Sequence, residues 1–101
     1  MIEVLDKATF TPLLNDKFEV SPVGMDKVEV ELVQITEKSA DFSEGFSLLF
    51  RGPKDSVFPH NTHMVKHPKI GEFELFIGPI MYPKTDGVYY EVIINRLKKD
   101  E

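Results

Sequence analysis

Apolar and polar residues alternate along most of this chain, and this period of two constrains the fold more than any other feature. The run Val-Glu-Val-Glu-Leu at 28–32 places an apolar side chain at every second position. Successive side chains of a β-strand point to opposite faces, so the period predicts a strand with one buried face. Similar alternation, weakest at 62–67, marks the segments 17–21, 46–51, 62–67, 72–77 and 90–95.

Turn-forming residues separate these segments, at 22–24, 52–55, 68–71 and 84–87. Six strands joined mostly by short turns predict an all-β fold, either a small antiparallel barrel or a two-layer sandwich. We favour the barrel, because closure removes exposed strand edges. Thr11 and Pro12 predict one short helical turn near the N-terminus, with Phe10, Leu13 and Leu14 over one end of the core. No repeat or linker divides the chain, so residues 1–101 are expected to form a single domain.

The alternation changes phase once, directly after Leu32. Val33 and Ile35 are apolar at positions where the phase of residues 28–32 predicts polar side chains. A β-bulge near Leu32 and Val33 would account for the slip, and so would coverage of this stretch on both faces.

Charge and cysteine content exclude several kinds of site. The chain has no cysteine, which excludes disulfides, thiolate metal centres and a cysteine nucleophile. Its first seven residues include two acids and no apolar run, so no secretory signal is expected, and no stretch could cross a bilayer as a helix. We therefore expect a cytoplasmic protein without a membrane partner.

Basic residues gather in the middle of the chain, although the net charge is −5. Arg51, Lys54, Lys66 and Lys69 could form part of a groove for nucleic acid, with Phe76 or Tyr89 as a stacking platform. They are few, and the acids outnumber the bases overall. The favoured interpretation is a basic strand paired with acidic neighbours, so a nucleic-acid partner is not expected.

The three histidines follow an H-x2-H-x3-H spacing at positions 60, 63 and 67. On a helix, His63 and His67 could share a metal ion, but the alternation and the flanking prolines favour a strand. Residues four apart on a strand lie about 13 Å from each other, too far for one ion. We expect surface histidines and no metal site, and a metal-dependent enzyme using His60–His67 stays an alternative.

Nothing in the sequence predicts a catalytic or cofactor-binding residue. The serines lie in polar connections or on outward strand positions, away from any strand-to-helix nucleophile elbow. The glycines stand singly and form no phosphate-binding loop. An enzymatic activity is therefore not expected.

Four apolar or aromatic residues fall on strand faces that alternation predicts to be exposed to solvent: Leu49, Phe76, Tyr89 and Ile93. The N-terminal segment could cover them, or they could contact another molecule. We take Leu49, Phe76 and Ile93 as a candidate interaction surface for a protein partner or for self-association. The leading hypothesis is a non-enzymatic interaction or assembly module, and a small-ligand-binding barrel with its site at one mouth is the main alternative.

Several motifs resemble an uncharacterised bacterial family of small all-β domains, about 100 residues long. They are Phe-Ser-Leu-Leu-Phe-Arg-Gly-Pro at 46–53, Phe-x-Pro-Leu-Leu-x3-Phe at 10–18, Gly-Glu-Phe-Glu-Leu-Phe-Ile-Gly-Pro at 71–79 and Tyr-Glu-Val-Ile-Ile-Asn-Arg at 90–96. The resemblance spans nearly the whole chain and implies no activity or ligand. It implies a phage-tail-like context, which agrees with an assembly role.

Overall fold

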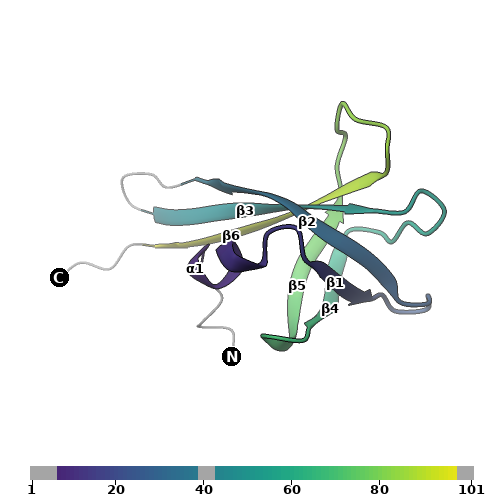
Figure 1. The fold of residues 1–101 in the computed structure, drawn as a ribbon, viewed down its shortest axis with the longest axis horizontal. Coiled ribbons are helices and arrows are strands. Elements are labelled where there is room, and N and C mark those ends of the chain that lie inside the picture. Colours follow the sequence, from purple (N-terminus) through teal and green to yellow (C-terminus); the bar gives the residue numbers. More distant parts are fainter. Residues whose placement is uncertain (1–6, 39–42, 98–101) are drawn as a thin grey trace.

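The computed structural model describes residues 7–38 and 43–97 as two short helices followed by six strands (Figure 1). The order is α1 (Lys7–Phe10), η2 (Thr11–Leu13), β1 (Lys17–Ser21), β2 (Val28–Glu37), β3 (Ser43–Gly52), β4 (Asn61–His67), β5 (Gly71–Pro79) and β6 (Val88–Leu97). All six predicted strands are therefore confirmed, including the weak one at 62–67.

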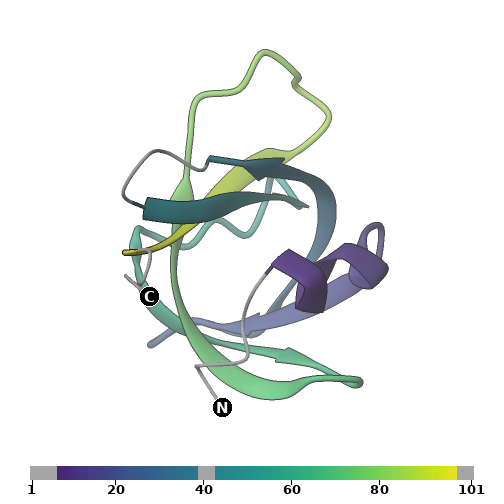
Figure 2. The same cartoon turned by 90° about the vertical axis from the view of Figure 1, so that its left-hand side faces the viewer.

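The strands close into an antiparallel barrel in the order β1-β2-β3-β6-β5-β4, with β4 returning to β1. Seen from one end, they form a ring with the short helical segment at the near opening (Figure 2). This confirms the barrel and excludes the sandwich. The turn before β5 contains Pro68 and ends at Gly71, whose φ of +82° is a conformation that glycine adopts without strain.

A β-bulge accounts for the change of phase in β2. Leu32 pairs with Phe50, and the next registered pair is Gln34 with Leu49, so Val33 is the extra residue. The bulge returns Ile35 to the inner face, where it packs against the core.

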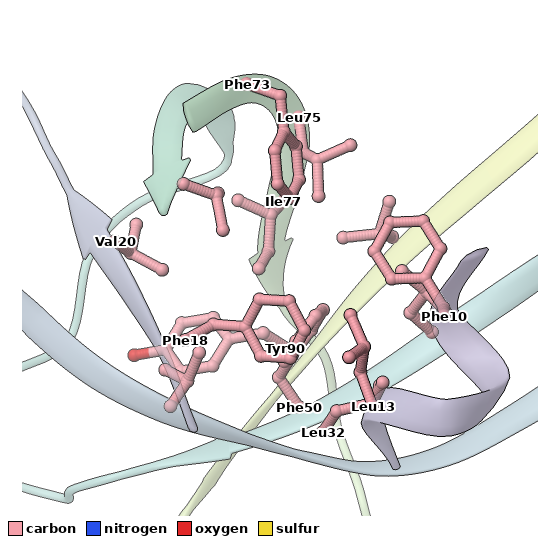
Figure 3. Close-up of a cluster of buried hydrophobic side chains, with 14 of the residues drawn as sticks. Phe10, Leu13, Phe18, Val20, Leu32, Phe50, Phe73, Leu75, Ile77 and Tyr90 are labelled. Atoms are coloured by element: carbon pink, nitrogen blue, oxygen red, sulfur yellow. The ribbon is translucent and has the colours of Figure 1, made fainter. Parts of the chain in front are cut away.

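The core contains the side chains that the alternation assigned to the inner face (Figure 3). On β3, β5 and β6 these are Phe46, Leu48, Phe50, Phe73, Leu75, Ile77, Tyr90 and Val92, all buried. In β4 the inward positions are His63, Val65 and His67. The phase of this strand was open from the sequence, and the structure settles it.

The N-terminal segment enters one end of the barrel. Phe10 is fully buried, with its ring 6.4, 6.0 and 6.2 Å from those of Phe18, Phe46 and Phe73. Leu13 is buried beside it, but Leu14 is 41% exposed, so its predicted place over the core is wrong. The helical region also begins earlier than predicted, at Lys7.

Backbone hydrogen bonds join the N-terminal segment to the barrel wall. The Asn15 amide donates to the Leu32 carbonyl at 2.7 Å, and the Leu32 amide donates to the Asp16 carbonyl at 3.0 Å. At the other end, the fully buried Phe58 stacks on Tyr90 with centroids 4.1 Å apart. Chain segments therefore fill both ends of the barrel.

Among the described residues, no helix has the length and apolar character needed to cross a membrane.

Candidate functional site

Three adjacent strands present a continuous outer wall, which we call the β5–β6–β3 face. Its outward positions are Phe76 and Gly78 on β5, Tyr89, Glu91 and Ile93 on β6, and Ser47, Leu49 and Arg51 on β3. Glu91 connects the three strands, because it pairs with Gly78 on one side and with Leu49 on the other.

The face exposes two of the three residues predicted to form an interaction surface. Phe76 is 61% exposed and Ile93 is 56% exposed. Extending the Gly78–Glu91 register by two residues along each strand places Phe76 at the level of Ile93. Phe10 and Leu13 do not cover them, since both are inside the barrel. Coverage by this part of the N-terminal segment is therefore wrong as an explanation of the apolar surplus.

Leu49 faces outward but is only 8% exposed. Its registered neighbours, Gln34 and Glu91, both carry longer side chains that flank it. Leu49 can therefore support the face from beneath, but it presents little surface of its own.

The imidazole of His60 covers the β5–β6–β3 face at Gly78, where β5 has no side chain. The His60 ring stacks on Phe76, with centroids 5.2 Å apart and planes 13° apart. It lies over Gly78, where an added Cβ would overlap the imidazole. The exposed Phe76 ring is thus held in place by a neighbour instead of moving freely, which the spacing of the histidines gave no means to predict.

The fourth apolar candidate, Tyr89, is buried by a loop and not by the N-terminal segment. Residues 80–87, which we call the β5–β6 loop, fold back so that Tyr82 stacks on Tyr89 at 4.3 Å. The Tyr89 hydroxyl donates to Asp86 at 2.8 Å, and Arg51 donates to Asp86 at 3.1 Å and to Glu31 at 2.7 Å. The Asp86-Gly87 turn signal marked this loop in the sequence, but not what it packs against.

These contacts shift the pKa values of the groups involved. The hydrogen bond from Tyr89 lowers the pKa of Asp86, and nearby Arg51 lowers it further. Burial raises the pKa of Tyr89, as does its bond to Asp86. Hydrogen bonds with Tyr89 and Glu31 raise the pKa of Arg51. Each charge in the cluster has a partner, so the cluster fastens the loop.

The histidines do not come together, and two of them are not on the surface as predicted. His63 and His67 are 3% and 2% exposed, because β4 turns these positions into the barrel. The Nε2 of His67 lies 3.0 Å from Asp16, and its Nδ1 accepts from the Lys69 amide at 3.0 Å. The Nε2 of His63 lies 2.8 Å from the Pro59 carbonyl. Among the described side chains, at 7–38 and 45–94, no three His, Asp or Glu are arranged to hold a metal.

The basic residues are spread around the barrel. Arg51 on β3 is bound to two carboxylates, and two strands separate it from Lys66 on β4. Lys66 stands opposite Glu19 on β1 and Glu72 on β5, which confirms the predicted pairing with acidic neighbours.

A groove of about 460 Å³ lies on the outer wall beside β1. Its charged lining includes two ion pairs, Lys17–Glu29 at 3.9 Å and Lys27–Glu19 at 3.7 Å. The groove is outside the barrel, and both mouths are filled, so it does not match the mouth site expected of a ligand-binding barrel.

Comparison with known proteins identifies a family but no activity. No curated protein and no solved structure matches the chain. A family model described as "Domain of unknown function (DUF6916)" matches residues 5–94. The match covers most of the 101 residues. The chain therefore belongs to the DUF6916 family of domains of unknown function.

Proposed function

We propose that this domain is a non-enzymatic interaction module that binds a partner protein through its β5–β6–β3 face. The observation that carries the proposal is Phe76, 61% exposed in the middle of a strand and stacked on His60. A barrel wall that meets only water is ordinarily polar at such positions.

Burial of this face by a partner would contribute favourably to the free energy of binding. Burying a Phe side chain is worth about 1.5–3 kcal/mol, and Ile93 adds a second apolar group on the adjacent strand. The stack with His60 already restricts the Phe76 ring, so less side-chain entropy is lost when a partner covers it.

Charge favours a different protein over a second copy of this chain. Glu74 precedes Phe76 by two residues on the same face of β5, and Glu91 lies beside Gly78. Two copies meeting face to face would bring these carboxylates together, and each copy of the chain carries a net charge of −5. The fitting partner has an apolar contact region bordered by Lys or Arg. An assembly role, as the family resemblance implies, is compatible with such a partner.

The test compares three tagged proteins in lysate of cells that naturally express the domain: wild type, Phe76→Glu and Val23→Glu. Val23 is 90% exposed in the turn between β1 and β2, so its variant is a control for the added charge. Quantitative mass spectrometry should find one or more proteins retained by wild type and Val23→Glu but lost by a folded Phe76→Glu. Equal recovery with all three, or self-association of the wild type through Phe76, would refute the proposal.

A further inference from the structure

The β5–β6 loop projects from the barrel and carries the most exposed apolar side chain of the described residues (Figures 1 and 2). Met81 is 99% exposed, between the half-buried Ile80 and Tyr82. A single exposed methionine needs no explanation by itself. The contacts that hold this loop against the barrel do call for an explanation.

Both limbs of the loop are fastened to the same residue, Tyr89. On the first limb, the Ile80 amide donates to the Tyr89 carbonyl at 2.9 Å, and Tyr82 stacks on the Tyr89 ring. On the second limb, Asp86 accepts from the Tyr89 hydroxyl and from Arg51.

The end of the second limb is also closely packed. A Cβ added at Gly87 would lie 2.7 Å from the Gly52 carbonyl oxygen, so a side chain here would push the loop off the wall. Contacts at both ends therefore fix the loop, while Met81, between the two fastened residues of the first limb, holds a flexible thioether in water.

We propose that the β5–β6 loop is a preformed anchor, and that Met81 inserts into an apolar pocket of the partner protein. This inference rests on the proposed function and adds a second contact to it. A loop that is already ordered loses little conformational entropy on binding. Methionine is unbranched and polarizable, so it adapts to an irregular pocket.

One partner can reach both contacts. Met81 follows Phe76 by five residues, and five residues of fully extended chain span at most about 18 Å. An ordinary interface of about 800 Å² per partner extends well beyond that distance. Asp86 is already bound to Arg51 and Tyr89, but Glu91 lies beside Gly78 on the face next to the loop, so the pocket should again be bordered by basic residues.

The first experiment places a photo-crosslinking amino acid at position 81, 76 or 23 of the full chain, in cells that naturally express it. Positions 81 and 76 should cross-link the same protein, and position 23 should not. The cross-linked peptide from position 81 should line an apolar pocket with Lys or Arg at its border.

The second experiment measures the affinity of that purified protein for folded variants. Met81→Leu should bind within about twofold of wild type, and Met81→Asp at least about tenfold more weakly. Asp86→Ala should also bind more weakly, although Met81 is intact, because the loop loses one fastening.

Four results would overturn the inference. Cross-linking from position 76 but not 81 would refute the anchor and leave the proposed function standing. Cross-linking from neither position would refute both. A second copy of this chain as the product at position 81, or unchanged affinity of Met81→Asp, would also refute the anchor.

Discussion

The imidazole of His60 lies nearly parallel to the ring of Phe76, with centroids 5.2 Å apart. Gly78 makes this possible, since the imidazole occupies the space that any side chain at position 78 would need. The loop before β4 thereby supplies a ring to the outer wall of β5. An exposed aromatic side chain on the barrel is thus held in one orientation.

Gly78→Ala should remove this stack with little effect on stability. The overlapping atoms belong to an exposed side chain that can swing away, so the free energy of unfolding should change by less than about 1 kcal/mol. The ring-current shift of the His60 Hδ2 proton in the NMR spectrum should disappear. The matched control is Gly52→Ala, whose Cβ would lie 3.0 Å from Val30 Cγ1 in the core and should cost about 1–3 kcal/mol. An unchanged His60 shift in Gly78→Ala would contradict this.

Phe10→Ala should destabilise the fold strongly, because the ring closes one end of the barrel against three other aromatic rings. The expected loss is about 3–5 kcal/mol, measured by urea denaturation. Leu14→Ala, four residues on and 41% exposed, should cost less than about 1 kcal/mol. Similar losses of unfolding free energy for both variants would show that Phe10 does not close the end of the barrel.

Alternation predicts which way a strand residue points, but not what lies over it. It correctly assigned Leu48 and Leu75 to the core and placed the bulge near Val33. It could not predict that Tyr89 would be buried, because the loop that covers it is held by side chains of β3 and β6.

The histidines show the same limit. The position of each His in β4 depends on a phase that the polar residues around it leave undefined, and burial depends on partners distant in sequence, such as Asp16. The strand period alone predicted that Phe76 and Ile93, the exposed apolar residues of the β5–β6–β3 face, point outward. The stack with His60 and the fastened loop are contacts between segments and needed the structure.

His63 and His67 should both carry a proton on Nε2, and His67 should carry none on Nδ1. The His63 Nε2 faces a carbonyl oxygen and must donate to it, while the His67 Nδ1 already accepts from the Lys69 amide. Nitrogen-15 NMR of the imidazole rings distinguishes the two tautomers. An unprotonated Nε2 on either ring, or a protonated Nδ1 on His67, would contradict the hydrogen bonds described here.

Asp86 should make the free energy of unfolding depend on pH in the acid range. Its pKa is lowered in the folded state from 3.8, so the stabilisation by its carboxylate is complete above that value and is lost as the pH falls through the lower, folded-state value. The difference in unfolding free energy between wild type and Asp86→Asn should be constant from about pH 7 to 5 and shrink below that. Urea denaturation at each pH measures it. Tyr89→Phe removes the main hydrogen bond, and the same substitution of Asp86 in that background should show a weaker dependence. A difference that grows on acidification would contradict the sign of the pKa shift.

Phe76 is proposed as a contact residue outside the core, and one titration distinguishes the two roles. The partner protein captured by the wild type is purified, and its affinity is measured by calorimetry for wild type and Phe76→Glu, with the melting temperature of each. Desolvating a new carboxylate opposes binding, while an exposed side chain contributes little to folding. We predict at least about a tenfold loss of affinity with a melting temperature close to that of wild type. Equal affinity, or a Phe76→Glu chain that unfolds, would exclude this role for Phe76.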